Sequence, residues 1–278
     1  RIKLGLPLEI FQEIQRASAN PLKDLVSVDQ VQWGAMELAQ IAAYRYRLFL
    51  ELYDPAHAGS LEQLDLNRRE DVRTFWSHFF KARQINKYGT EEEPLTYVLR
   101  HTQLLPRQVL MILQRIVISS AAETGGYREF KAEAVTAAIE EMEPLVASEI
   151  LRPFRYVYPH AEQISRPVFA NCPTVLSFDE LEDKWRKKGR PTLRRLGAYV
   201  FDTTEFAEML MRMGILGVVE EERDRYFEGS FGYDALAPRN IGEGNKLCLH
   251  PIFSRHFSAA GNERRKAVIP HGVSIRWS

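Results

Sequence analysis

The sequence is poor in cysteine and has no long hydrophobic run. Its two cysteines, Cys172 and Cys248, are far apart and match no metal-ligand spacing. Such sparse cysteine is typical of a reduced intracellular protein and does not provide a disulfide scaffold. No apolar run approaches the roughly 18 residues that a membrane span requires, and the first residues, RIKLGLP, do not form a signal peptide. We therefore expect a cytoplasmic protein without a membrane partner.

Neither sign of charge is in excess. Lys plus Arg and Asp plus Glu both number 37 in a chain of 278 residues, so no global charge attracts nucleic acid or an acidic membrane. The length allows two domains, and the composition is that of an ordinary globular protein. Any polyanionic partner must therefore bind a local patch.

The sequence also lacks the motifs of common catalytic sites. No G-x-x-x-x-G-K-[ST] phosphate-binding loop occurs, and the nearest glycine cluster, GEGNK at 242–246, predicts a hairpin loop. The seven histidines show no metal-ligand spacing, and no serine or cysteine stands in a nucleophile motif. We assign no catalytic residue and no metal ligand, and we expect that this chain alone does not hydrolyse ATP.

The first half of the chain carries the periodicity of helices. Apolar residues recur at helical spacing over 34–53, and FWSHFF adds an aromatic helix face that predicts core packing. We expect a long helix from Pro106 that stops at Gly125, and another over 130–155. The polar stretch 54–71 is rich in turn residues and predicts a loop.

The second half changes character from about Tyr158. Short helices are predicted over 161–169, 177–188 and 203–213, the second opened by the capping box SFDE. Three strands follow, and the tail NERRKAVIPHGVSIRWS is predicted to add an edge strand. Three helices followed by a strand pair and a loop is the order of a winged helix-turn-helix unit. The strands are predicted in GILGVVEE, RYFEGSFGYDAL and NKLCLHPIF.

The pair Pro106-Arg107 is the first candidate binding feature. Proline pre-sets the first turn of a helix, so Arg107 would project from a rigid element. A guanidinium in such a position binds a phosphate bidentately and in a fixed direction. The alternative is a surface arginine in a salt bridge, which is the more common role of an isolated arginine.

Three segments resemble motifs of one ATPase class: GLPLEIF at 5–11, LLPRQVL at 104–110 and HPIF at 250–253. With the helices around them, they resemble the back half of a bacterial P-loop ATPase of the AAA+/STAND-like class, whose relatives include KAP-like and defence-associated ATPases. In that class an arginine that opens a lid helix senses the nucleotide phosphates, and a winged helix follows. The resemblance implies this role for Arg107, with Glu9 close to the nucleotide.

The resemblance divides the chain into three parts. It implies the last strand and helix of a P-loop core over 1–33, a helical lid domain over 34–156 and a winged-helix domain over 157–278. The expected fold is mainly α with a small β component: the end of an α/β core, a lid bundle and a winged helix. ATP and Mg²⁺ would be held by an upstream region that is not in this chain, which begins at Arg1 rather than at a methionine.

The sequence departs from the pattern of the class at four positions. Pro7 stands where the first motif has arginine, and Glu9 stands where it has aspartate. In the second motif, Leu105 and Gln108 replace the flanking arginine and acid. These replacements leave open a slow ATPase or a nucleotide that serves only as a structural ligand.

A basic segment, DKWRKKGRPTLRR, is the second candidate binding feature. Seven cations around Trp185 within a short stretch fit the phosphate backbone of a nucleic acid. The alternative, a solvated helix end and loop, is the more common role of such a charge run. The seven cations, called the basic patch below, are Lys184, Arg186, Lys187, Lys188, Arg190, Arg194 and Arg195.

The helix over 203–213 is the one placed to read DNA bases in a winged helix. It carries Glu205 and Glu208 and is otherwise largely apolar, whereas base reading requires arginine, lysine, asparagine or glutamine. We therefore interpret the winged helix as an interaction or regulatory module, which binds a partner protein or another copy of the chain. DNA remains a possible partner of the basic patch.

These observations favour one function and leave two alternatives. The favoured function is a nucleotide-dependent switch, in which Arg107 senses ATP and the winged helix transmits the change; the resemblance extends this to antiphage defence. The first alternative is a non-enzymatic helical and winged-helix scaffold that binds DNA or protein through the basic patch. A stand-alone enzyme of another kind is the third possibility.

Overall fold

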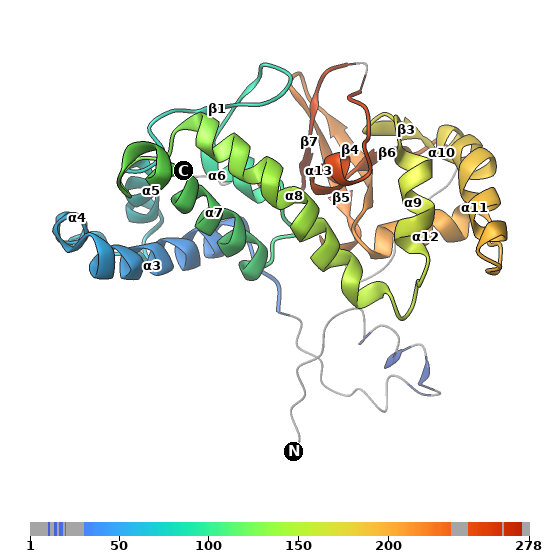
Figure 1. Cartoon of the computed structure of the whole chain (residues 1–278), viewed down its shortest axis with the longest axis horizontal. Helices are drawn as coiled ribbons and strands as arrows, with labels where there is room; N and C mark the ends of the chain where they lie inside the picture. Colours follow the sequence, from blue (N-terminus) through green and yellow to red (C-terminus); the bar gives the residue numbers. More distant parts are fainter. Residues whose placement is uncertain are drawn as a thin grey trace.

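The computed structural model describes residues 31–234, 244–262 and 264–273, with Phe11, Ile14, Gln15, Ala17, Ser18 and Asn20. The described part is mainly helical with a small mixed sheet, as expected for the coarse fold class (Figure 1). The predicted strand that ends a P-loop core, and Glu9 with it, lie outside the described residues.

Six helices make up the first part of the described chain. The helix expected over 34–53 and the helix that ends at Gly125, where φ is +69°, are both confirmed. The predicted loop over 54–71 is wrong, because it contains α4 and the start of α5. Asp54 accepts a hydrogen bond from the backbone N–H of His57, so the turn residues there start a helix. The helices are α3 (Ala35–Tyr53), α4 (Pro55–Ser60), α5 (Arg69–Ser77), α6 (Pro94–Leu99), α7 (Pro106–Thr124) and α8 (Ala132–Phe154).

Aromatic rings form the centre of this helical part. The ring of Tyr46 on α3 lies 4.8 Å from that of Phe79 and 5.4 Å from that of Phe130. Trp76 is buried and donates from Nε1 to the carbonyl of Ala39. The aromatic stripe FWSHFF is therefore core, as the sequence predicts.

A short hairpin between α5 and α6 was not predicted from the sequence. Strands β1 (Gln84–Ile85) and β2 (Glu91–Glu92) pair antiparallel. Asn86 shapes the turn, since its side-chain oxygen accepts from the N–H groups of Tyr88 and Thr90. The hairpin places Glu92 in the interior.

The second part contains a sheet of five strands in the order β3-β6-β4-β5-β7. Neighbouring strands are antiparallel, except that β5 and β7 are parallel. The three predicted strands and the edge strand in the tail are confirmed, and β3 was not predicted. The strands are β3 (Val175–Ser177), β4 (Leu216–Glu222), β5 (Tyr226–Phe231), β6 (Lys246–Leu249) and β7 (Ala267–Pro270).

The helices that accompany the sheet agree closely with the prediction. Ser177 opens α10 with the expected capping box. The helix expected to end at Lys188 instead continues through a π-helical turn, η1 (Trp185–Gly189), into α11 (Arg190–Arg195). The other helices are α9 (Ala161–Phe169), α10 (Phe178–Lys184), α12 (Thr203–Arg212) and α13 (Pro251–His256).

Both parts share one hydrophobic core. A single cluster of buried apolar side chains includes residues from Ala35 to Val273, and α8 packs against both α7 and α13. Figure 1 shows α8 crossing the molecule between these two helices. The helical part and the part with the five-stranded sheet are therefore packed together, while the lid and winged-helix domains and their boundary at 156/157 stay predictions.

Candidate functional site at the α6–α7 junction

The loop from Arg100 to Leu105 joins α6 to α7 and is fixed by its own side chains. Gln108, in the first turn of α7, accepts a hydrogen bond from the N–H of Gln103 at 2.7 Å. Thr102 donates to the carbonyl of Leu99 and accepts from the N–H of Leu104. Leu104 has φ of +52°, an unusual conformation for a leucine. The start of α7 is therefore set by defined contacts.

The same loop contacts the end of α12. The Gln103 side-chain amide donates to the carbonyl of Met213, the C-cap residue of α12, at 3.0 Å. Gly214 follows with φ of +65°, and a Cβ atom there would lie 2.4 Å from Nε2 of Gln103. Glycine is required here both by the backbone and by the close approach of this side chain.

His250 lies on the other side of the junction. It caps α13, is fully buried and has its Nε2 atom 2.9 Å from the hydroxyl of Tyr233. The backbone of Thr102 lies close enough to this imidazole to influence its pKa. Burial lowers the pKa of His250 to about 3, with a smaller contribution from His101, so the imidazole is neutral. The predicted closing motif HPIF thus packs against the α6–α7 loop.

A cluster of buried polar side chains adjoins the loop. Arg100 and Glu92 are 2.8 Å apart, and both are buried. His101 Nδ1 lies 2.7 Å from Glu143 of α8. Burial lowers the pKa of His101, so this contact joins a neutral imidazole to a carboxylate. Sequence reasoning missed these residues, because the β1–β2 hairpin that positions Glu92 was not predicted and Glu143 on α8 is distant from His101 in the sequence.

Several polar atoms of this cluster have no aligned hydrogen bond. Arg100 Nε and His101 Nδ1 are close to their carboxylate partners but do not meet hydrogen-bond geometry, and neither amide atom of Gln84 has a partner. Such groups are costly in a protein interior and are uncommon in native structures. The junction therefore buries polar groups whose pairing matters for the stability of this region.

Helix α8 connects the junction to the rest of the molecule through its acidic residues. Glu143 contacts His101 and also lies 3.3 Å from Arg255 of α13. Toward its C-terminal end, Glu149 lies 2.7 Å from Arg107. A movement of the start of α7 relative to α8 would therefore change the contact between Arg107 and Glu149.

Arg107 lies on the first turn of α7, as predicted, and is largely exposed. Its side chain is 77% exposed and is paired with Glu149. This is the surface salt bridge that the sequence left open as the alternative to a phosphate sensor. The other predicted nucleotide-binding residue, Glu9, lies outside the described residues.

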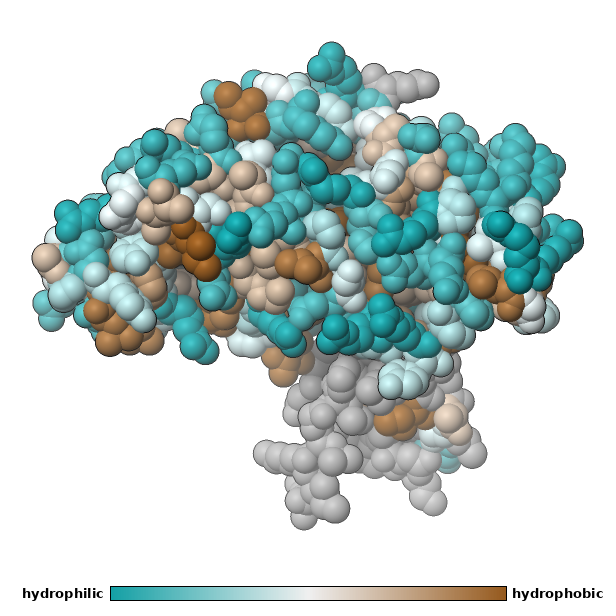
Figure 2. Space-filling view, viewed as in Figure 1, coloured by the Kyte–Doolittle hydropathy of each residue, from teal (hydrophilic) through white to brown (hydrophobic). Residues whose placement is uncertain are grey.

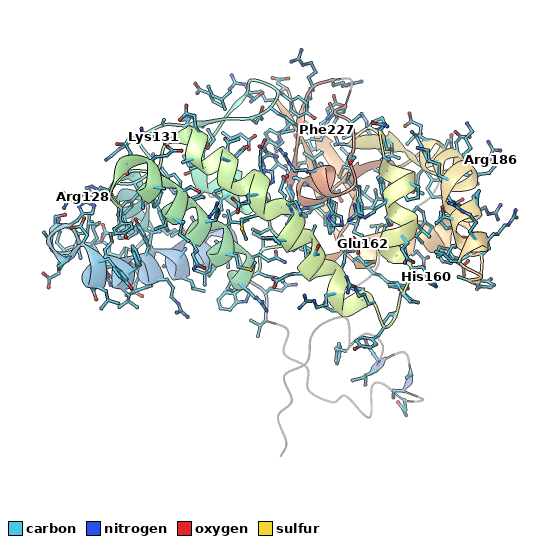
Figure 3. All side chains as sticks on the ribbon, in the orientation of Figure 1. Arg128, Lys131, His160, Glu162, Arg186 and Phe227 are labelled. Atoms are coloured by element: carbon cyan, nitrogen blue, oxygen red, sulfur yellow. The ribbon has the colours of Figure 1, made fainter. Side chains whose placement is uncertain are left out.

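The basic patch follows α10, η1 and α11. Arg186 and Lys187 both pair with Asp183 and remain about two-thirds exposed, at 68% and 65%. Figure 3 shows Arg186 at the end of the molecule, and Figure 2 shows mostly hydrophilic side chains over this end. Trp185 is 1% exposed, so the expectation that an aromatic ring contributes to a nucleic-acid footprint is wrong. Its ring stacks on Phe201 and Phe206 instead.

Helix α12 presents little surface for reading bases. Most of its side chains are buried, including Phe206 and Leu210. The residues that reach solvent include Glu205 and Glu208, and Glu208 pairs with Arg212 at 3.7 Å. This burial favours the interpretation of α12 as a packing element.

No helix in the described part of the chain has the length and apolarity to cross a bilayer. Within the same residues, no group of three or more histidine, cysteine or acidic side chains is arranged to hold a metal ion. The two cysteines are free and buried. The chain matches no family model, and comparisons with curated proteins and with solved structures gave no match.

Proposed function

We propose that this chain is the lid and winged-helix region of an ATP-binding P-loop protein and acts as a nucleotide-dependent switch. The order α9-β3-α10-α11-α12-β4, with β6 between β3 and β4, supports a winged-helix unit. ATP and Mg²⁺ are bound by an upstream region in this proposal. In this proposal, binding of ATP changes the position of the lid, and the winged-helix part transmits this movement to a partner protein or to another copy of the chain.

The hydrogen bond from Gln103 to Met213 is the observation that carries this proposal. It joins the loop before α7 to the C-cap residue of α12, so a displacement of the start of α7 acts directly on the winged-helix unit. His250, the N-cap of α13, lies close to the backbone of Thr102 in the same loop and adds a second point of approach. The helical part and the sheet-containing part are packed against each other and meet at the polar α6–α7 junction. Such a pair can change between two discrete relative positions.

Arg107 is the nucleotide sensor in this proposal. Its contact with Glu149 is exposed, so little free energy is lost when the pair separates. A nucleotide phosphate carries more charge than Glu149 and offers bidentate geometry to the guanidinium. Exchange of Glu149 for a phosphate would move the first turn of α7 relative to α8.

The test compares two arginines of α7 in the intact natural protein. Arg107→Ala is expected to weaken ATP binding by about tenfold or more, the loss expected for a charge-assisted contact. Arg115→Ala is the matched control, because Arg115 is on the same helix and pairs with Glu141 of α8. Equal ATP affinity in the wild type and Arg107→Ala would remove the sensor assignment.

A second function is favoured by the continuous helical rod formed by α10, η1 and α11. The rod exposes Arg186, Arg194 and Arg195. We infer that a scaffold binding nucleic acid through its phosphate backbone is the alternative function. Its expected signature is duplex binding with a steep salt dependence, whose logarithmic slope decreases by about 0.9 for each phosphate-binding arginine that is replaced by glutamine. Absence of duplex binding at low salt would contradict it.

A further inference from the structure

The turn that follows α11 carries an exposed aromatic residue, Tyr199. It is 79% exposed, and its ring makes no aromatic contact within the described part of the chain. Leu196, in the same turn, is 39% exposed and adds apolar surface. An open aromatic ring beside a basic segment is one of the two components of a surface that binds unpaired bases.

Backbone hydrogen bonds fold this turn back onto the end of α11. The N–H of Ala198 donates to the carbonyl of Leu193, and the N–H of Gly197 donates to the carbonyl of Arg194. Gly197 has φ of +65°, the left-handed conformation that commonly follows the end of a helix. Because the chain reverses here, Tyr199 comes directly after a residue that is bonded to α11.

The last two residues of α11 are exposed cations. Arg194 and Arg195 form no ion pair with a described residue, in contrast to the two cations that share Asp183. Arg195 donates to the hydroxyl of Thr192, one turn earlier on the same helix. Two guanidinium groups are therefore available to phosphate at the end of α11 that is followed by Tyr199.

The chain beyond Tyr199 is also anchored. Phe201 stacks on the buried ring of Trp185, with ring centroids 5.1 Å apart. Asp202 then caps α12. The short segment that carries Tyr199 is thus held to the rod on one side and joined to α12 on the other. A segment that is already fixed loses less conformational entropy when a ligand binds.

Carboxylates border this surface on the side of α12. Asp202 and Glu205 each accept from the backbone N–H of the other in the capping box. Their charge repels phosphate, so a polyanion is expected to follow α11 and not α12. Figure 1 shows α11 at the outer end of the molecule, beyond α12. Most side chains of α12 are buried, so this helix does not read base edges in a groove.

We propose that Arg194, Arg195, Leu196 and Tyr199 bind single-stranded nucleic acid. The proposal rests on the second function proposed above and names its substrate class. The ring of Tyr199 stacks on an unpaired base, and the two guanidinium groups bind the phosphates next to it. A duplex is bound less well, because its bases are stacked on one another and expose only their edges in the grooves.

The test measures binding of the intact protein to a fluorescent single strand and to the duplex of the same sequence. A strand of about 12 nucleotides lies within the usual range of binding-site sizes. Fluorescence anisotropy is expected to show that the single strand binds about tenfold more tightly than the duplex, which is the contribution of one stacked base. DNA and RNA strands are both measured, because stacking and phosphate contacts are common to them.

Variants separate stacking from charge. Tyr199→Ala is expected to weaken single-strand binding by about tenfold and to leave duplex binding unchanged, which also shows that the variant is folded. Tyr199→Phe keeps the ring and is expected to bind as the wild type. Tyr53→Ala, which removes an exposed tyrosine of α3, is the matched control. Arg194→Gln and Arg195→Gln are each expected to reduce the logarithmic salt slope by about 0.7.

The results that would overturn this inference differ from those that would overturn the scaffold function. Equal affinity for single strand and duplex, unchanged in Tyr199→Ala, would overturn the inference and leave phosphate-backbone binding by the basic patch intact. An equal loss in Tyr199→Ala and Tyr199→Phe would also overturn it, since the ring would not be the binding group. Absence of binding to either nucleic acid at low salt would overturn both proposals.

Discussion

The side-chain amide of Gln103 donates a hydrogen bond of 3.0 Å to the carbonyl of Met213, 110 positions along the chain. This bond joins the loop before α7 to the end of α12. Because Gly214 lies directly beneath the Gln103 side chain, the approach of the two segments depends on the absence of a Cβ atom. The contact gives the α6–α7 loop a direct connection to the part of the molecule that contains the five-stranded sheet.

Gly214→Ala is expected to destabilise the protein and to loosen this junction. Gly197→Ala is its matched control, because both glycines have φ of +65° but a Cβ at Gly197 meets nothing within 4 Å. The control loses about 1 kcal/mol through backbone strain alone. Gly214→Ala is expected to lose about 1–3 kcal/mol more through the clash. Equal losses in urea unfolding would show that the close approach of Gln103 and of the Tyr233 ring to Gly214 is unimportant for stability.

Gly189→Ala tests the packing of Trp185 in the π-helical turn. Alanine is favoured over glycine inside a helix by about 1 kcal/mol, so propensity alone predicts stabilisation. The Cβ at Gly189 would lie 2.0 Å from Cε3 of Trp185, and we expect a net loss of about 1–3 kcal/mol. Gly59→Ala in α4 has no atom within 4 Å of its Cβ and is expected to stabilise or be neutral. A stabilised Gly189→Ala variant in thermal unfolding would contradict this account of the turn.

The stability of the protein is expected to fall as the pH decreases below the pKa of an ordinary histidine side chain. Burial lowers the pKa of His250 to about 3 in the folded protein. The unfolded chain, with a histidine pKa near ~6.5, therefore binds more protons between these values, and stability rises with pH in this window. One such proton contributes a slope of about 1.4 kcal/mol per pH unit.

His250→Gln separates this contribution from the other titrating groups. The variant loses stability at neutral pH because it disturbs a buried contact with Tyr233. Between about pH 4 and 6, the free energy of unfolding in urea is nevertheless expected to change less steeply with pH in the variant than in the wild type. The difference in slope corresponds to about one bound proton. His101, whose pKa is also lowered by burial, accounts for part of the remaining slope. An unchanged slope in the variant would contradict a neutral, buried His250.

Arg107→Ala is expected to leave stability almost unchanged. The side chain is 77% exposed and its partner Glu149 is accessible to water, so the pair contributes about 0–1 kcal/mol. Thermal unfolding of the wild type and the variant checks this directly. A large loss of stability would mean that Arg107 has a structural role, and any loss of nucleotide binding would then need another explanation.

The sequence predicted elements where local patterns decide the structure. Apolar periodicity predicted α3, and the capping box at Ser177 predicted the start of α10. The hairpin of β1 and β2 was missed because strands of two residues carry no periodic signal. The junction was missed for a different reason: Gln103 and Met213 meet only because α8 and α13 bring the two halves of the chain together.

Trp185 shows how a local pattern can mislead. Its position among seven cations suggested that the ring belonged to a nucleic-acid footprint, but in the π-helical turn the ring is buried and stacks on Phe201 and Phe206. A register change inside a helix alters which residues face the core, and a composition pattern does not reveal it.

Amide hydrogen exchange of the intact protein with and without ATP and Mg²⁺ tests the central proposal most directly. If the switch operates, binding of nucleotide alters the rate of amide exchange in the α6–α7 loop. The rate is also expected to change in α12 and β4, which are connected to this loop by the hydrogen bond between Gln103 and Met213. Arg107→Ala is expected to abolish the change in α12 and β4. Exchange in α12 and β4 that does not respond to nucleotide, or that responds equally in Arg107→Ala, would contradict the proposed switch.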